Sequence, residues 1–228
     1  MRLQAVFSAG DREWTLGELP QPLSLDALLP GAGDWQVEIG FGKGRYLLES
    51  ALAHPDRRFL GLEIASKYFR MLRHRARRRG TDNLLLVRGE ALYLLSTVLP
   101  KAFAAALHVY FPDPWPKSRH HRRRLFDPET LDLVLGVLRP GGELLFATDF
   151  IAYGERVREI LKGYPELSVE DRDGPWPDGA RTNYEAKYMA SGRPILRLSA
   201  RLSGHAEAGR LHPAGEAGIV AATARRQD

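Results

Sequence analysis

The 228-residue sequence contains no cysteine and no apolar run long enough to cross a bilayer. Without cysteine there are no disulfides and no thiolate sites for zinc or iron–sulfur clusters, which fits a reducing compartment. A membrane-spanning helix needs about 18 consecutive apolar residues, and the short N-terminal run soon meets charged residues, so it resembles neither a signal peptide nor a span. We therefore expect a cytoplasmic protein that has neither a membrane nor a metal partner.

Acidic residues are missing from two stretches in which basic residues accumulate. Residues 67–79 hold seven Lys or Arg and one His, and residues 117–124 hold five Lys or Arg and two His, in a chain of formal charge +5. Clustered cations suit a polyanion, because each neutralised phosphate releases counterions. The distribution therefore favours a nucleic-acid partner. The alternative is that these stretches are solvated helix faces in an arginine-rich chain.

Short apolar runs alternate with amphipathic stretches from residue 36 onward, which is typical of a parallel sheet covered by helices. Strands are expected at residues 36–39, 58–63, 83–88, 105–111, 143–148, 167–171 and 194–199. Helices are expected at residues 44–53, 65–79, 91–99, 127–138 and 153–162, with a short one in the loop before the last strand. The last strand is expected to run antiparallel to its neighbour.

The domain organisation follows from where this pattern begins and ends. Residues 1–202 are expected to form one α/β domain with its core at 36–199, although residues 1–30 show no clear periodicity. Residues 203–228 are rich in Ala and Gly and carry few large apolar side chains. Such a composition predicts a flexible tail.

A glycine-rich segment, VEIGFGKG, joins the first predicted strand to the first predicted helix and contains Gly40, Gly42 and Gly44. Glycines let a backbone turn tightly and approach a ligand, although many such turns bind nothing. Glu38 stands just before the turn, where its carboxylate would repel a pyrophosphate but attract an ammonium group. Since no intact GxGxxG is present, the segment favours S-adenosylmethionine (SAM), which carries an α-amine, over NAD.

Two further acids stand at the ends of the next two predicted strands. Glu63 is placed to accept both ribose hydroxyls of an adenosine, and Glu90 to accept from the adenine amino group. For each, a simple helix cap is the alternative. Because the carboxyl ends of parallel strands meet at one edge of a sheet, Glu38, Glu63 and Glu90 are expected to converge on one crevice.

The fourth predicted strand ends in FPDPWPK. Pro112 and Pro114 fix the backbone on both sides of Asp113 and oppose continuation as a helix. The segment is therefore predicted to hold the Asp113 carboxylate and the Trp115 indole over the strand end. A plain proline-rich turn would explain the prolines but not the Asp, Trp and Lys among them.

Five motifs occur in a fixed order over residues 36–199: EIGFGKG, the strand-end GLE, FPDPWPK followed by RHHRRR, ATD at 147–149 and TNYE at 182–185. Together they resemble the bacterial tRNA (guanine-N7-)-methyltransferase family. The resemblance implies a class I methyltransferase fold, Rossmann-like, with a mostly parallel seven-stranded sheet and helices on both faces. It also implies SAM as methyl donor and N7 of guanine 46 in the variable loop of tRNA as acceptor. We expect a monomer or a homodimer.

The resemblance also assigns roles by position. The implied cofactor-binding residues are Glu38, Glu63, Glu90 and Asp113, beside the glycines of the turn, and Asp113 is also the implied catalytic residue. The implied substrate contacts are Lys117, Asp149, Thr182, Asn183, Tyr184 and Glu185. The chain departs from the family at Glu90, where Asp is common, and at Arg122, where Lys is common.

The implied chemistry suits these residues. Guanine N7 has a free lone pair at neutral pH, so catalysis can rest on alignment and on a carboxylate, here Asp113, that stabilises positive charge moving onto the purine. Asp149 and Glu185 are candidates to accept from guanine N–H groups, and Trp115 either stacks on a base or only props the loop. The expected phosphate contacts are Lys117, Arg119, Arg122, Arg123 and Arg124, with helix 65–79 as a weaker candidate.

Three alternatives remain from the sequence. The first is a methyltransferase for another RNA or a small molecule, against which the basic block and TNYE argue. The second is an RNA-binding protein without activity, against which the intact acidic set argues. An NAD-linked oxidoreductase is disfavoured by the missing GxGxxG.

Overall fold

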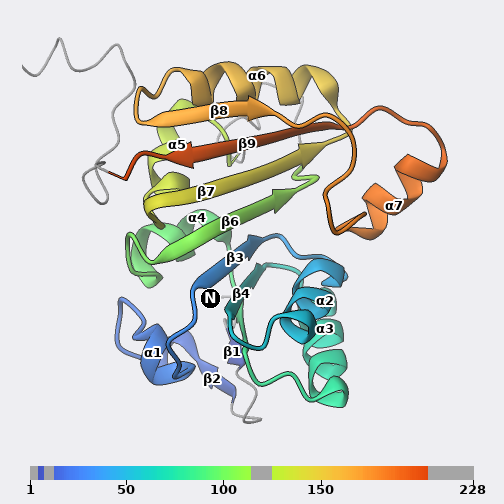
Figure 1. Ribbon diagram of the computed structural model, residues 1–228. Coiled ribbons are helices and arrows are strands. Elements are labelled where there is room, and N and C mark those ends of the chain that lie inside the picture. Colours follow the sequence, from blue (N-terminus) through green and yellow to red (C-terminus); the bar gives the residue numbers. More distant parts are fainter. Residues whose placement is uncertain (1–4, 8–12, 114–124, 205–228) are drawn as a thin grey trace, which may run out of the picture.

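The computed structural model describes residues 5–7, 13–113 and 125–204, and within these ranges nine strands form one sheet (Figure 1). The strands are β1 (Ala5–Phe7), β2 (Glu13–Thr15), β3 (Trp35–Ile39), β4 (Arg58–Glu63), β5 (Leu84–Arg88), β6 (Ala104–Tyr110), β7 (Leu138–Thr148), β8 (Leu167–Asp171) and β9 (Leu196–Leu202). The helices are α1 (Leu25–Leu28), α2 (Arg45–Ala53), α3 (Ser66–Arg79), α4 (Ala91–Tyr93), α5 (Pro128–Leu135), α6 (Ile151–Lys162) and α7 (Asn183–Ala190), with short helical turns η1 (Leu16–Glu18) and η2 (Leu94–Val98). None of the helices in these ranges is long and apolar enough to cross a membrane.

The sheet order is β2-β1-β5-β4-β3-β6-β7-β9-β8. Strands β5, β4, β3, β6 and β7 are parallel, and β9 lies antiparallel between β7 and β8. The seven predicted strands and the antiparallel last strand are therefore confirmed. The count of seven is corrected to nine, because β1 and β2 add an antiparallel edge from a stretch in which three-residue strands are too short to show alternation.

A second correction concerns the start of β7. Residues 139–142, which separate the predicted helix 127–138 from the predicted strand 143–148, lie inside this strand as a bulge: Ala104 pairs with Leu138, whereas Ala106 pairs with Glu143. Gly141 has φ 78° there, a left-handed conformation that glycine adopts readily. The strand resumes at Glu143 and carries the chain to Thr148, beside the end of β6.

Both faces of the sheet are covered, which explains why its central strands are buried along almost their whole length. On one face, α2 and α3 pack through residues such as Leu47 and Leu72 against Leu86 of β5. On the other face, α5 and α6 contribute residues such as Leu131 and Val157 to a second apolar cluster. The sheet is thereby fixed in the middle, and only its strand ends remain for a binding site.

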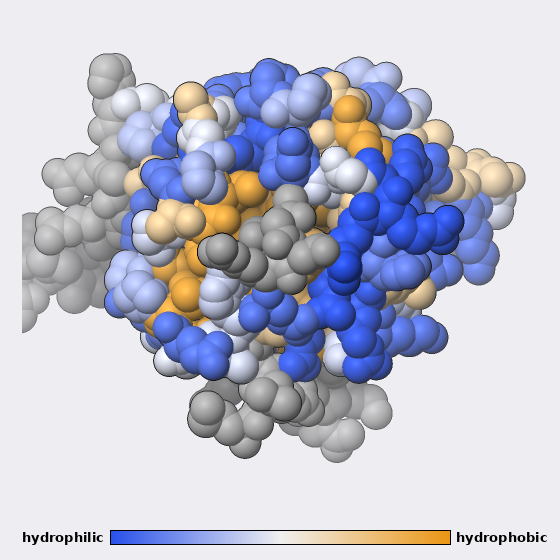
Figure 2. Space-filling model, turned by 90° about the horizontal axis from the view of Figure 1, so that it is seen from below, coloured by the Kyte–Doolittle hydropathy of each residue, from blue (hydrophilic) through white to orange (hydrophobic). Residues whose placement is uncertain are grey.

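Helix α3 shows how the basic stretch 67–79 is accommodated. Phe69, Leu72 and Ala76 are buried, and the basic side chains lie on the rest of the helix surface. Hydrophilic side chains accordingly gather on the side of the molecule where α3 lies (Figure 2). The cations of its last turn stand next to the negative end of the helix dipole, and Gly80 ends the helix in a left-handed conformation.

Gly44 and Gly80 offer a matched pair for testing the packing of α2 on α3. Both have left-handed φ, 66° and 64°, but a Cβ at Gly44 would lie 2.4 Å from a methyl group of Leu72, whereas one at Gly80 meets nothing within 4 Å. Replacing either by Ala costs roughly 1–2 kcal/mol for the backbone conformation, and Gly44→Ala adds ~1–3 kcal/mol for overpacking. Urea unfolding should therefore show the larger loss for Gly44→Ala, and equal losses would contradict the packing described here.

Candidate active site

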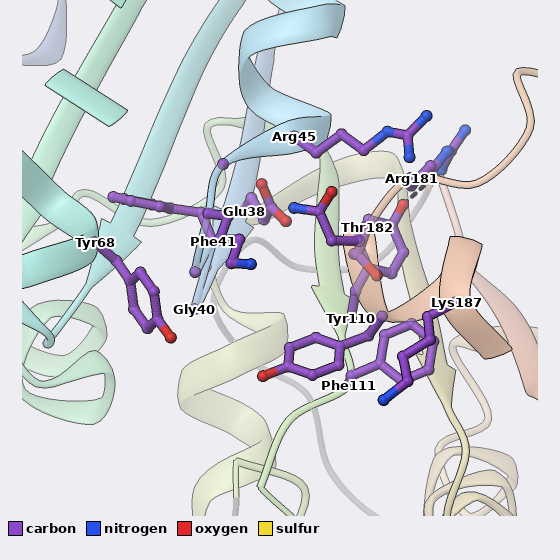
Figure 3. A pocket seen from close by; sticks show the side chains of 15 residues that line it. Glu38, Gly40, Phe41, Arg45, Tyr68, Tyr110, Phe111, Arg181, Thr182 and Lys187 are labelled. Carbon is purple, nitrogen blue, oxygen red and sulfur yellow. Dashed lines mark hydrogen bonds between the residues drawn. The ribbon is translucent and has the colours of Figure 1, made fainter. Parts of the chain in front are cut away.

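A cavity of about 330 Å³ opens where the chain leaves the carboxyl ends of β3 and β6 (Figure 3). Its walls come from the glycine turn, from the ends of the two strands, and from the start of α7, which lies beyond the tips of β6 and β7 in Figure 1. The lining residues are Glu38, Gly40, Phe41, Gly42, Lys43, Gly44, Arg45, Tyr68, Tyr110, Phe111, Arg181, Thr182, Asn183, Tyr184 and Lys187. Segments far apart in the sequence therefore build one site.

The glycine turn forms one wall of the cavity. The Gly40 N–H donates to the Leu62 carbonyl (2.8 Å), which ties the turn to β4. A Cβ at Gly40 or Gly42 would meet no atom within 4 Å, so the space above the turn is open to a ligand. The turn thus has the shape that the sequence predicted for a cofactor cradle.

Glu38 lies beside this turn and is 2% exposed. Its Oε2 has no hydrogen-bond partner among the described residues. Burial, and after it the charge of Glu63, raises the pKa of Glu38 to about 8, while the charge of Arg181 acts in the opposite direction. A buried carboxylate with a free oxygen is an acceptor for a cationic ligand group, because such a group would replace the solvation that burial removes.

Glu63 stands at the end of the neighbouring strand β4 and is 8% exposed. Its Oε2 accepts from the Gly42 N–H (2.9 Å) and its Oε1 from the Ala65 N–H (2.8 Å). The carboxylate therefore fixes the glycine turn and the start of α3 at once. Binding of ribose hydroxyls by Glu63 stays a prediction that uses its remaining acceptor capacity.

Glu90 is exposed and caps α4 with both carboxylate oxygens, which accept from Leu92 N–H (3.0 Å) and Tyr93 N–H (2.7 Å). The helix cap, one of its two predicted roles, is thus present in the structure. Glu90 does not line the cavity, although it follows β5 at the same edge of the sheet as Glu38 and Glu63. Its contact with adenine stays a prediction.

Asp113 is exposed and follows Phe111, which lines the cavity. Phe111 has φ 52°, a conformation that bulky residues rarely adopt, and its N–H donates to the Ala147 carbonyl (2.7 Å). The predicted residues Trp115, Lys117, Arg119, Arg122, Arg123 and Arg124 lie outside the described residues, and their roles stay predictions.

The predicted segment 182–185 begins α7. Thr182 is its N-cap and accepts from the Glu185 N–H (2.9 Å). Thr182, Asn183 and Tyr184 line the cavity, but Glu185 does not. Glu185 is fully buried: Oε1 accepts from Arg197 Nε (2.8 Å) and Oε2 from the Arg181 N–H (2.8 Å). The structure therefore uses Glu185 to anchor α7 to β9 and does not bring its carboxylate to the predicted substrate.

Asp149 follows β7 and is partly buried. Its Oδ2 pairs with Arg193 Nη2 at 2.6 Å, and the Arg193 guanidinium lies 4.6 Å from the centre of the Tyr188 ring. Tyr188 stacks on Tyr184, whose ring is 59% exposed, and both approach Phe111. Sequence reasoning did not reveal this exposed aromatic group, because its members come from two segments about 70 residues apart.

A buried polar cluster below the cavity also escaped the sequence analysis. His108 contacts the hydroxyls of Tyr46 (2.7 Å) and Tyr110 (2.8 Å) and the amide oxygen of Gln36 (3.1 Å). Arg181 Nη1 donates to the Tyr110 hydroxyl at 2.5 Å. Burial, aided by the charge of Arg181, holds the pKa of His108 well below its usual range, so the ring is neutral. The available signal was the two-residue spacing of His108 and Tyr110, which places both on one face of β6.

Within the described ranges, no three His, Asp or Glu residues come close enough together to hold a metal ion.

Solved structures share this fold. The crystal structure of the 16S rRNA methyltransferase KamB has a TM-score of 0.63 at 19% identity and covers 87% of this chain and 99% of that chain. A variant of the 16S rRNA (adenine(1408)-N(1))-methyltransferase of Catenulisporales acidiphilia, solved with the cosubstrate SAM, has a TM-score of 0.59 at 19% identity and covers 90% and 99%. These likenesses show that the chain has the fold of the class I SAM-dependent methyltransferases, with a cavity at its strand ends.

Proteins of similar sequence identify the family to which the chain belongs. The family described as putative methyltransferase matches residues 33–198. The tRNA (guanine-N(7)-)-methyltransferase of Nitrosococcus oceani is 34% identical over 78% of this chain and 75% of its own length. The enzymes of that name from Bordetella pertussis and Roseobacter denitrificans are 36% and 37% identical, over 82% and 83% of this chain and 74% and 82% of their own lengths. The chain belongs to the tRNA (guanine-N7-)-methyltransferase family, as its motifs predicted.

The raised pKa of Glu38 predicts a pH dependence of stability. An unfolded Glu has a pKa of about 4.3, so between about pH 5 and pH 8 the unfolded chain binds fewer protons than the folded protein. The free energy of unfolding should then fall as pH rises, by at most ~1.4 kcal/mol per pH unit from this group, and level off above about pH 8. Urea unfolding without ligand is measured for the wild type and for Glu38→Gln over this pH range. The variant should lack this fall, so the difference in free energy of unfolding between the two proteins should change with pH, because all other groups titrate alike in both. A pH-independent difference would show that the carboxyl titrates normally.

Proposed function

We propose that this protein transfers the methyl group of SAM to N7 of the guanine at position 46 in the variable loop of tRNA. The observation that carries the proposal is the buried Glu38 carboxylate, which has a free oxygen beside an open glycine turn, in a chain whose relatives bear the name tRNA (guanine-N(7)-)-methyltransferase. The cytoplasm, where tRNA is processed, is the expected location, and a monomer or homodimer is the expected state.

The described residues fit SAM as the methyl donor. Glu38 is placed to accept from the α-ammonium group, the turn at Gly40 and Gly42 leaves room for the ligand to approach the backbone, and Glu63 and Glu90 stand at the next two strand ends. When bound, SAM supplies a methyl group made electrophilic by its sulfonium.

On the substrate side, the protein needs no general base, because guanine N7 already carries a free lone pair. The residues of the chain therefore have to align the purine and stabilise the positive charge that it gains. Asp113 is the proposed carboxylate for this task. It is exposed two residues after Phe111 of the cavity wall, so it can meet a base that enters from solvent.

The rest of the tRNA is proposed to contact the residues around this opening. Thr182, Asn183 and Tyr184 line the cavity, and Asp149 lies beside the exposed aromatic group. Glu185 is proposed to support them from below through its hold on α7. Lys117, Arg119 and Arg122 to Arg124 are proposed to bind phosphates, because guanidinium and ammonium groups neutralise the backbone.

The product of the reaction tests the proposal directly. The protein is incubated with SAM and two transcripts of one tRNA, one with guanine and one with adenine at position 46, and the nucleosides are analysed by mass spectrometry. 7-Methylguanosine should form only in the first transcript. Methylation at another nucleotide would replace the proposed substrate, and SAM binding without any transfer would support a binding protein instead.

A substitution at Asp113 tests its role in the transfer. Asp113→Asn keeps the shape but removes the charge, and loss of one preorganised electrostatic group costs about 10²–10³ in rate. Single-turnover methyl transfer should slow by this factor, while tRNA binding stays within about twofold. Asp56→Asn, at an exposed acid before β4 and so at the opposite edge of the sheet, serves as the control. Full activity of Asp113→Asn would remove Asp113 from the mechanism.

A further inference from the structure

We infer that Arg181 binds the α-carboxylate of SAM across the cavity from Glu38. The inference rests on the proposed cofactor and adds a residue to its site that lies outside the motifs of the family, directly before TNYE. Glu38 and Arg181 would together form a receptor for a zwitterion, with the acid on the ammonium group and the guanidinium on the carboxylate.

The placement of the two charges is the first argument. Glu38 and Arg181 line the same cavity from two different elements (Figure 3). Glu38 belongs to the end of β3, and Arg181 belongs to the loop before α7. They are close enough for the charge of Arg181 to act on Glu38, yet no ion pair joins these two described side chains and Glu38 Oε2 has no partner. Two opposite charges kept apart across a cavity leave room for a ligand group of each sign.

The rigidity of Arg181 is the second argument. Its Nε donates to the Asp178 carboxylate (3.0 and 3.1 Å) and its Nη1 to the Tyr110 hydroxyl (2.5 Å). Its guanidinium lies 4.5 Å from the centre of the Trp176 ring and 5.3 Å from that of Tyr46. The side chain is only 14% exposed. Because these hydrogen bonds and aromatic rings already hold the guanidinium in place, it loses little further conformational freedom when it binds a ligand.

The remaining donors are the third argument. Arg181 has no hydrogen-bond partner for Nη2 among the described residues, so this nitrogen keeps two N–H groups for a ligand. Planar guanidinium donors match the geometry of a carboxylate. The other arginine of the cavity wall, Arg45, is 34% exposed and pairs with Glu49 of its own helix, so it is less confined and less desolvated than Arg181.

A pair of ligands that differ only in the carboxylate isolates this contact. Calorimetric titration compares S-adenosylhomocysteine with its decarboxylated counterpart, 5′-deoxy-5′-(3-aminopropylthio)adenosine. The wild-type protein should prefer the carboxylate-bearing ligand by at least about tenfold, the scale of a charge-assisted hydrogen bond. Arg181→Met should lose this preference by weakening only the first ligand, with the affinity for the second unchanged within about twofold.

Two further variants keep the test decisive. Arg172→Met removes another guanidinium near Trp176 (6.0 Å) that pairs with Glu143 outside the cavity, and it should bind both ligands as the wild type does. Asp178→Asn weakens the hydrogen bonds from Arg181 Nε without replacing Arg181 itself. It should partly reduce the preference for the carboxylate-bearing ligand. This variant therefore tests the inference even if Arg181→Met folds poorly.

The outcomes separate the inference from the function on which it rests. Equal weakening of both ligands by Arg181→Met, or an unchanged preference, would overturn the role of Arg181 while leaving SAM as the cofactor. A loss of the preference in Arg45→Met but not in Arg181→Met would move the carboxylate to Arg45. Failure of the wild-type protein to bind either ligand would instead overturn the proposed function.

Discussion

Glu38 lies in the middle strand of the parallel sheet, where its carboxylate is almost fully removed from water and one oxygen has no hydrogen-bond partner in the part of the chain that the structure describes. The protein keeps this arrangement only because its surroundings are rigid. Strands β4 and β6 hold β3 on both sides, and Glu63 fixes the glycine turn in front of it. In the proposed function, a cationic ligand group would offset the cost of burying this acid, and a perturbed buried acid in a cavity is typical of a binding site.

The opposite wall depends on a second buried acid, Glu185, that is fully satisfied. Its hydrogen bonds to Arg197 and to the backbone of Arg181 fasten α7 to β9. The residues of α7 that line the cavity are therefore held rigidly relative to the sheet. Both acids are buried, but Glu38 is the proposed ligand-binding residue, whereas Glu185 supports the wall of the cavity. The difference lies in whether the protein supplies the partner.

Much of the architecture could be predicted from periodicity and turn residues. The seven longer strands and the main helices fall where apolar runs and amphipathic stretches indicate, because burial on both faces leaves a strong pattern. β1 and β2 could not be found, since three residues carry no period. In the site, the motifs pointed to Glu38, the glycines and residues 182–184, and all of these line the cavity. The motifs could not tell that Glu185 turns inward, because burial is decided by the distant Arg197. Arg181 escaped notice because two of the residues that it contacts, Tyr46 and Tyr110, come from distant parts of the chain.

Phe111 has a conformation whose consequence reaches beyond the cavity. A left-handed backbone at a bulky residue costs on the order of 1–2 kcal/mol, and here it is held by the bond to Ala147 and by ring contacts with Tyr184 and Tyr188. It sets the direction in which the chain departs toward Pro112 and Asp113. The exit of that loop is therefore a property shared by β6, β7 and α7. A change in the direction of this exit would therefore require changes in all three elements together.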